Sequence, residues 1–250
     1  MISIQNLSKC YANRFVLQNL SLNIPQGEWR GIVGESGSGK STLARILMGV
    51  DQPTLGEIYI QGVALKRWRR SAEGRIGVVF QDYHRSINPH FTIQTALEEA
   101  FWCQNKRASL AEISTILEQV ELSSTLLRRY PHELSGGQLQ RVSLARALAL
   151  QPKFLILDEA LSALDISTKV EIIRLLQKAK EQSSLTALII AHDLETILAL
   201  CERFGVLCRG RLIEEVESRS SHLACHPYTQ ELLGALLPLP HPKPQRERIS

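Results

Sequence analysis

The 250-residue chain is long enough to bury a substantial core, and its 44% hydrophobic and 22% charged residues exclude a largely disordered protein. Its 29 basic and 25 acidic residues leave a formal charge of +4, which is too small an excess to indicate nucleic-acid binding. Five scattered cysteines form no CxxC pair, so we expect reduced thiols in a reducing compartment.

The first predicted elements lead into a glycine-rich segment. Apolar and polar residues alternate between Ile2 and Ile24, which predicts short antiparallel strands. Trp29 to Val33 is then predicted as a short buried strand, and from Ser41 onward apolar residues recur at helical spacing. The sequence therefore predicts a strand, a glycine-rich loop and a helix in that order.

The glycine-rich loop, Gly34-Glu35-Ser36-Gly37-Ser38-Gly39-Lys40-Ser41, matches the phosphate-binding pattern GxxxxGK[ST]. Glycines let the backbone wrap an anion so that successive N–H groups face phosphate oxygens. In this pattern Lys40 reaches the β and γ phosphates and Ser41 offers its hydroxyl to Mg²⁺. The alternative is a turn without chemical meaning, but chance should give such a match in roughly one chain in a hundred of this length.

Further apolar runs at residues 76–80, 154–157 and 185–191 are separated by helical stretches, which is typical of a parallel sheet with crossover helices. Between about 82 and 150 the apolar positions follow a helical period instead. One predicted helix face there consists of Leu110, Ile113, Ile116, Leu117 and Val120. We therefore predict an α/β fold with a helical subdomain inserted at about 82–150.

The strand that begins at Phe154 ends in two carboxylates, Asp158 and Glu159, at the sheet edge where α/β proteins bind ligands. There Asp158 would hold Mg²⁺ through water, and Glu159 could accept a proton from the water that attacks the γ phosphate. Alone, such a pair is more often a helix cap or a solvated turn. The glycine loop upstream favours the functional interpretation.

A second glycine-containing segment, Leu134-Ser135-Gly136-Gly137-Gln138, precedes a predicted helix and prepares another anion-binding N-terminus. With the glycine loop before it and the acidic strand end after it, this pentapeptide resembles the signature of the ABC ATPases. The other family motifs also occur in order: Tyr11 as the adenine-stacking residue, Gln81 as the Q-loop, Ser162 to Asp165 as the D-loop and His192 as the switch histidine. Singly, Tyr11 could be a core residue, Gln81 a surface amide and His192 a strand-end histidine.

The resemblance covers about residues 1–217 and implies a P-loop NTPase core with an N-terminal antiparallel β subdomain. It also implies that two chains sandwich two ATP molecules with Mg²⁺. The implied catalytic residues are Glu159, His192 and Lys40, and the implied Mg²⁺ ligands are Ser41, Gln81 and Asp158. The residues implied to bind ATP are Tyr11, Gly34, Glu35, Ser36, Gly37, Ser38, Gly39, Lys40, Ser41, Thr42, Gln81 and Asp158, with Ser135, Gly136, Gly137 and Gln138 facing the ATP of the partner chain.

Two stretches point to one branch of the family. Val79 to Asp82 with Ser86 to Pro89, and His226 to Thr229, resemble sequences in the ATPases of oligopeptide, dipeptide and nickel importers. Leu161 and the absence of a C-terminal cysteine cluster favour nickel or metal-chelate uptake, with peptide import as the alternative. This branch implies a heterodimer with a second, similar ATPase, two transmembrane permease subunits and an extracytoplasmic solute-binding protein, with this chain on the cytoplasmic face of the inner (plasma) membrane.

Two other classes compete. An ATPase of cofactor assembly could carry an equally complete cassette, whereas a regulatory cassette without turnover is disfavoured because every catalytic position is present. We expect one ATPase domain at residues 1–225 and a partly disordered extension at 226–250, which holds four prolines from 238 to 244. His222, His226 and His241 lack the tight spacing of metal ligands, and the basic run at 66–70 is expected to be a solvated loop or a face near anionic lipid.

Overall fold

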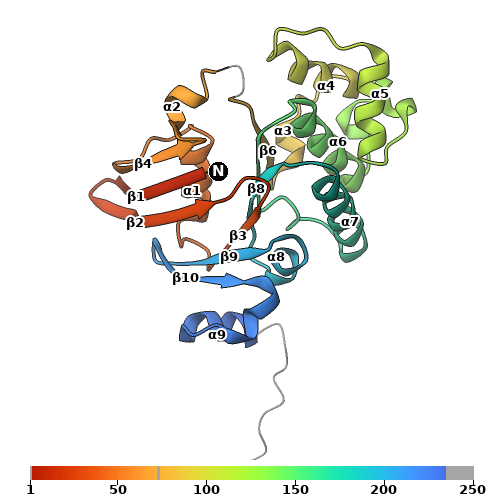
Figure 1. The fold of residues 1–250 in the computed structure, drawn as a ribbon. Helices are drawn as coiled ribbons and strands as arrows, with labels where there is room; N and C mark the ends of the chain where they lie inside the picture. The colour runs from red at the N-terminus through yellow and green to blue at the C-terminus, as the bar shows by residue number, and fades with distance from the viewer. Residues whose placement is uncertain (1, 72–73, 235–250) are drawn as a thin grey trace, which may run out of the picture.

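A computed structural model describes residues 2–71 and 74–234 and contains two β-sheets (Figure 1). The four-stranded sheet is antiparallel, with the order β2-β1-β4-β5, and the six-stranded sheet has the order β10-β9-β3-β8-β7-β6. The strands of the first sheet are β1 (Ile2–Tyr11), β2 (Arg14–Ile24), β4 (Leu55–Ile60) and β5 (Val63–Ala64). Those of the second are β3 (Trp29–Val33), β6 (Ile76–Phe80), β7 (Phe154–Asp158), β8 (Thr186–Ile190), β9 (Arg203–Cys208) and β10 (Arg211–Glu217).

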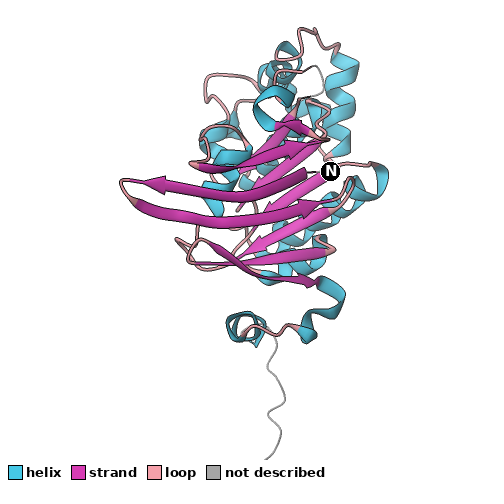
Figure 2. Ribbon diagram, turned by 60° about the vertical axis from the view of Figure 1, so that its left-hand side comes forward, coloured by secondary structure: helices cyan, strands magenta, loops and turns pink. Residues whose placement is uncertain are grey.

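The six-stranded sheet is parallel except for β10, which pairs antiparallel with β9 at its edge. Its central strands are buried on both faces, which explains why their sequences are mostly apolar; Arg30 on β3 is a buried exception. Ile32, Ile156 and Ile190 pack with α1 (Lys40–Leu47) and the antiparallel sheet. Their neighbours Val33, Leu157 and Ile189 pack with the helices on the other face (Figure 2). The predicted α/β class with an N-terminal antiparallel sheet is confirmed.

Most of the remaining helices cover that second face. They are α3 (Tyr83–Ser86), α4 (Ile93–Trp102), α5 (Leu110–Gln119), α6 (Gly136–Ala149), α7 (Ile166–Gln182) and α8 (Leu194–Leu200), with short 3₁₀ turns η1 (Ser124–Arg128) and η2 (Pro131–Glu133). The predicted face of α5 is correct for Ile113 and Leu117, which are fully buried, but wrong for Leu110, which is 60% exposed. Leu110 is the first residue after the Ser109 cap and lies outside the helix interface.

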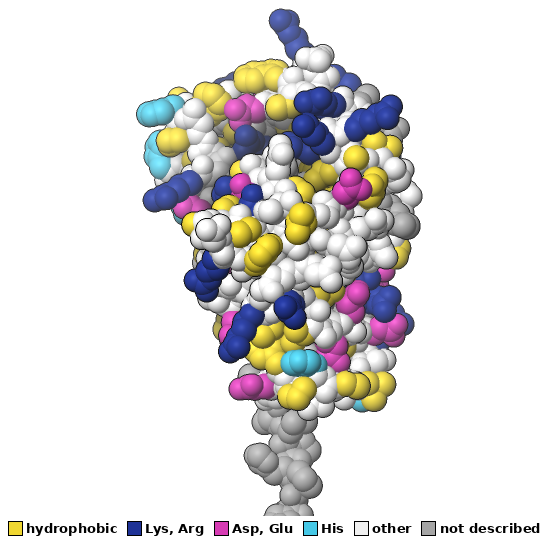
Figure 3. Space-filling model, turned by 90° about the vertical axis from the view of Figure 1, so that its left-hand side faces the viewer, with side chains coloured by type: hydrophobic (Ala, Val, Ile, Leu, Met, Phe, Trp, Pro, Cys, Tyr) yellow, Lys and Arg dark blue, Asp and Glu magenta, His cyan; other side chains and the backbone are white. Residues whose placement is uncertain are grey.

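The basic run at 66–70 lies on and just after α2 (Leu65–Trp68). Trp68 is 3% exposed and anchors this helix, while Lys66, Arg67, Arg69 and Arg70 are exposed. Figure 3 shows lysine and arginine side chains gathered in the upper part of the face that carries the antiparallel sheet. The basic side chains of the run are therefore exposed, and they lie on and after a short helix rather than in a loop.

The segment after β10 forms a 3₁₀ turn, η3 (Ser218–Leu223), and a helix, α9 (Pro227–Gly234). The extension expected to be partly disordered spans residues 226–250. Residues 227–234 of it form α9, and residues 235–250, with His241, lie outside the described residues. In the part of the chain that is described, no three potential ligands gather as a metal site. Over the same ranges, none of the helices combines the length and the apolar character that a membrane span requires.

Arg30 on β3 has a long, buried, charged side chain whose contacts link three strands. Its side chain is 1% exposed overall, and its Nε donates to Oε1 of Glu28 at 2.7 Å. One terminal nitrogen contacts the carboxylate of Glu215 on β10, and the other donates to the carbonyl of Asn23 on β2 at 3.1 Å. The guanidinium thus connects β2 of the antiparallel sheet to β3 and β10 of the six-stranded sheet.

Candidate functional site

The candidate site lies at the carboxyl edge of the six-stranded sheet. Strand register sets Phe80 beside Asp158 and Asp158 beside Ile190, and Ile190 lies beside Ile32 of β3. The residues that follow these strands therefore meet at one edge, which is where α/β sheets bind ligands. They are Gln81 after β6, Glu159 after β7, His192 after β8 and Gly34 after β3.

The glycine loop folds around the ammonium group of Lys40, whose side chain is buried. Its Nζ donates to the carbonyls of Gly34 at 2.8 Å and Glu35 at 2.9 Å. An ammonium has three N–H donors, so one remains for a ligand. Burial lowers the pKa of Lys40, and the nearby carboxylates of Glu159 and Asp158 oppose this shift.

The other predicted loop residues differ in exposure. Glu35, Ser36, Gly37 and Ser41 are exposed, Thr42 is half-buried, and Ser38 is buried with no hydrogen-bond partner for its Oγ. Gly39 has φ +110° at the start of α1, and a Cβ there would lie 2.7 Å from Cδ2 of Leu17. Only glycine fits this approach of the β1–β2 hairpin to the loop.

Gly34→Ala should lower the free energy of unfolding by about 1–3 kcal/mol, because a Cβ at Gly34 would lie 2.1 Å from the carbonyl oxygen of Leu207. Gly37→Ala is the matched comparison, since it also has a positive φ but no atom within 4 Å of the added Cβ. Urea unfolding of both variants measures the difference. Equal losses would mean that backbone strain, not the contact with Leu207, sets the requirement for glycine at residue 34.

The acidic pair, Asp158 and Glu159, lies close enough to Lys40 to interact with its charge. Burial raises the pKa of Asp158, Glu159 raises it further, and Lys40 opposes both effects. The Oδ1 atom of Asp158 is buried and has no hydrogen-bond partner in the described protein. An unpartnered carboxylate oxygen beside a phosphate-type loop fits a hydrated divalent cation, because such a cation would satisfy its lone pairs.

Glu159 has a left-handed backbone with φ +50°, which is uncommon for a residue other than glycine. Its N–H donates to the carbonyl of Ile190 at 2.9 Å. Its carbonyl accepts from the backbone N–H of Ser162 at 3.2 Å and from the Ser162 hydroxyl at 2.8 Å. The neighbouring strand and the D-loop segment therefore hold this conformation.

His192 is exposed, and it lines the same small cavity as Glu159, with a volume of about 10 Å³. The next residue, Asp193, caps α8 and accepts a hydrogen bond from Lys169 on α7 at 2.9 Å. Burial opposes ionisation of Asp193, but the bonds from Lys169 and Thr196 outweigh it and lower the pKa of Asp193. Sequence reasoning did not name Lys169 or Asp193, although an Asp after a strand and before a helix is a recognisable cap signal.

Tyr11 lies at the end of β1, and its ring is 41% exposed. Its hydroxyl donates to Asp51 at 2.7 Å, which raises the pKa of Tyr11. The same hairpin touches the glycine loop at Gly39 through the carbonyl of Val16. The Lys9 ammonium lies 4.7 Å from the centre of the Tyr11 ring, and the hairpin that carries Tyr11 lies against the loop.

Ser135 to Gln138 form the N-terminus of α6 in a capping box, in which Gln138 N donates to Ser135 Oγ at 3.3 Å and Ser135 N donates to Gln138 Oε1 at 3.0 Å. A Cβ on Gly137 would lie 2.7 Å from Cγ2 of Thr168 on α7. In Figure 1, α6 lies among the helices on one side of the six-stranded sheet, and α1 lies with the antiparallel sheet on the other. The structure does not bring the two predicted anion-binding segments of one chain together on one face.

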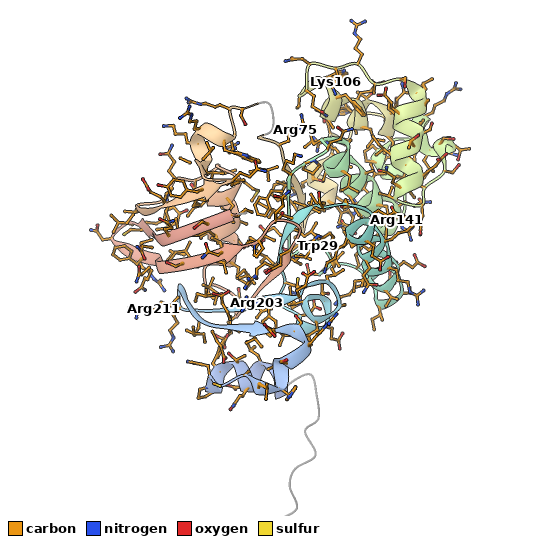
Figure 4. The ribbon with its side chains drawn as sticks, in the orientation of Figure 1. Trp29, Arg75, Lys106, Arg141, Arg203 and Arg211 are labelled. Carbon is orange, nitrogen blue, oxygen red and sulfur yellow. The ribbon has the colours of Figure 1, made fainter. Side chains whose placement is uncertain are left out.

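Two further residues fix α6. Gln140 is 1% exposed, and its Nε2 donates to the carbonyl of Ala160, next to Glu159, at 2.7 Å. Arg141 reaches Glu121 after α5 at 3.1 Å and Glu171 on α7 at 2.8 Å (Figure 4). The sequence analysis named neither role. The available signal was the position of Gln140 beside Leu139 in a mostly apolar helix. The helix is thereby connected to the acidic strand end.

Comparisons with known proteins agree over nearly the whole chain. A family profile described as ABC transporter matches residues 17–162. A putative peptide import ATP-binding protein of Brucella ovis is 39% identical over 260 residues, covering 99% of this chain and 82% of that protein. The oligopeptide transport ATP-binding protein OppF of Streptococcus mutans is 36% identical over 263 residues, covering 100% of this chain and 85% of that protein.

Solved structures give the same picture. A dimeric ATP-binding cassette in a post-hydrolysis state, bound to ADP and inorganic phosphate, matches with a TM-score of 0.77 and 33% identity, over 88% of this chain and 99% of that one. The protein cbiO1 of Clostridium perfringens, part of an ABC transporter complex, matches with a TM-score of 0.78 and 25% identity, over 96% of this chain and 95% of that one.

Proposed function

Because this chain belongs to the ABC transporter family of ATPases, we propose that it is the ATP-hydrolysing subunit of a peptide importer. The observation that carries the ATPase chemistry is the convergence of Lys40, Asp158 and Glu159 at one sheet edge, where each affects the pKa of a neighbour. The peptide assignment draws on relatives that are named for peptide or oligopeptide import and that align along almost the whole chain.

This assignment reverses the preference for nickel drawn from the sequence. Leu161 was one reason for that preference, yet its side chain is 6% exposed and belongs to the main core. Packing alone explains an apolar residue there, so Leu161 carries no information on the transported substrate. Nickel becomes the alternative outcome of the uptake experiment below.

In the proposed mechanism, the backbone N–H groups of the glycine loop and the remaining N–H of Lys40 hold the β and γ phosphates of ATP. Mg²⁺, when bound, would neutralise phosphate charge, and Ser41, Gln81 and Asp158 would hold it, Asp158 through water. Glu159 accepts the proton of the attacking water, and His192, which follows the neighbouring strand β8, orients that water and the γ phosphate. Tyr11, which is 41% exposed, stacks on the adenine.

Each ATP site would be shared between two chains. The glycine loop and Ser135 to Gln138 belong to opposite sides of the sheet, so the signature of one chain would meet the nucleotide of its partner. Gly136 and Gly137 would bring the N-terminus of α6 close to the γ phosphate. The partner would be a similar ATPase, and the pair would attach to two permease subunits on the cytoplasmic face of the membrane, supplied by an extracytoplasmic binding protein.

In cells whose only copy of this chain carries Glu159→Gln, we expect uptake of a labelled oligopeptide or dipeptide to be lost while nickel uptake is unchanged. Wild type and Glu118→Gln, an exposed substitution on α5, are the controls. Parallel uptake of the labelled peptide and radioactive nickel measures the effect. Loss of nickel uptake alone would assign the chain to the metal branch, and unchanged uptake of both would contradict the importer.

A further inference from the structure

A tyrosine at the far end of the chain contacts the glycine loop directly. The backbone N–H of Glu35 donates to the hydroxyl oxygen of Tyr228 on α9 at 3.1 Å. We propose that Tyr228 is a positioning residue for ATP binding, and that it acts by fixing the Glu35 peptide of the glycine loop. This inference rests on the proposed function, because it assigns the loop to ATP.

Glu35 transmits this contact to Lys40. Its N–H is held by Tyr228, and its carbonyl accepts from Nζ of Lys40 at 2.9 Å and from the N–H of Ser38 at 3.2 Å. The Glu35 side chain is exposed and takes no part in these bonds. Glu35 therefore contacts Tyr228 through its N–H and the ammonium of Lys40 through its carbonyl.

Helix α9 is itself held firmly enough to act as a support. Thr229 is fully buried and Leu233 is 9% exposed. Glu214 on β10 accepts hydrogen bonds from the backbone N–H groups of Cys225 at 2.6 Å and His226 at 3.2 Å. These contacts fix the start of α9 against the edge of the sheet, so the position of Tyr228 is determined by the fold.

The state of the Tyr228 side chain suits an acceptor role. Its ring packs against the main core, and burial raises the pKa of Tyr228, so the phenol stays neutral at physiological pH. The N–H of Tyr228 donates to Nδ1 of His226 at 3.2 Å, which orders the backbone at the first turn of α9. A neutral, ordered phenol oxygen can then accept the Glu35 N–H without a competing charge.

The contact also decides which N–H groups at the start of the loop are used within the protein. The N–H of Glu35 donates to Tyr228 and the N–H of Ser38 donates to the Glu35 carbonyl, so the phosphate would be bound by other N–H groups of the loop. From the other side, the N–H of Gly210 donates to the carbonyl of Ser38 at 2.9 Å. The first part of the loop is thus pinned at two points before any ligand binds, and this lowers the ordering cost of binding.

Tyr228→Phe should raise the Kd of the full-length chain for a fluorescent ATP analogue with Mg²⁺ by about 3- to 10-fold, the range of one hydrogen bond. The ring and its packing remain, so the Tm of the nucleotide-free variant should stay within about 2 °C of wild type. The rise in Tm on adding MgATP should shrink, because tighter ligands stabilise more. Glu231→Gln, an exposed change on the same helix, is the control.

A double-mutant cycle separates positioning from a general loss of structure. Glu35→Pro removes the donor N–H itself, so adding Tyr228→Phe to it should weaken binding no further. Glu35→Ala keeps the N–H, and Tyr228→Phe should retain its full effect in that background. An unchanged Kd in Tyr228→Phe, or an equal further loss in the Glu35→Pro background, would overturn the proposal. A wild-type chain that failed to bind ATP would overturn the proposed function as well.

Discussion

ATP hydrolysis by Glu159→Gln is expected to fall by about 10²- to 10⁴-fold, while ATP binding stays near that of wild type. Glutamine has the same shape but cannot take the proton of the attacking water. The backbone of Glu159 is fixed by Ile190 and Ser162, so the substitution leaves the local conformation unchanged. The variant should then keep ATP bound and accumulate as a nucleotide-bound dimer, which size-exclusion chromatography with ATP detects.

The comparison variant is Glu118→Gln, which makes the same chemical change on the exposed surface of α5. Phosphate release should be measured on the assembled transporter, because each site is proposed to need two chains. Undiminished hydrolysis by the assembled Glu159→Gln variant would remove Glu159 from the role of base. A loss of ATP binding in that variant would instead indicate damage to the loop or to the sheet edge.

Arg30→Met should lower the free energy of unfolding by about 3–5 kcal/mol, the range found when one partner of a buried ion pair is removed. Methionine fills part of the space but leaves the Glu28 carboxylate, whose side chain is 14% exposed, without its cation. It also leaves the carbonyl of Asn23 without the Arg30 donor. Equilibrium unfolding in urea measures the change.

Arg211→Met provides the comparison, because Arg211 is an exposed arginine on β10 whose side chain, among the described residues, donates to Gln18 alone. Its loss should stay within about 0.5 kcal/mol, as for most surface substitutions. Similar losses for both arginines would show that burial of the Arg30 cluster contributes little. ATP binding by Arg30→Met, measured below its Tm, should stay close to that of wild type because Arg30 does not reach the site.

The central strands were predictable because a parallel strand covered on both faces must be apolar throughout. The sequence therefore places β3 at the same residues as the structure and β7 to within one residue. It also places β6 at its observed residues, although β6 is an edge strand. Strands β4 and β10 lie at or near sheet edges, carry mixed side chains and were not identified. Helix α9 was also not predicted, and its segment was expected to be partly disordered. The start of this helix is held by Glu214 on β10, a contact that forms only in the folded chain.

The chemical part of the site was predictable for a related reason. Phosphate loops and acidic strand ends need particular residue types at fixed spacing, and such patterns can be recognised in the amino-acid sequence. The supporting contacts have no such pattern. Gln140 meets Ala160, and Tyr228 meets Glu35, only after the chain has folded, and the second pair is separated by 193 residues in sequence.

Strand β3 lies between β8 and β9, which come from residues 186–208. The ribosome therefore synthesises β3 long before the two strands that pair with it. During synthesis, the glycine loop emerges well before the strands that flank it and before Tyr228. Because long-range pairings of this kind form slowly, the loop should remain unstructured through most of translation. Competence to bind ATP would then be acquired last, so that ATP binding by nascent chains of increasing length would report completion of the sheet.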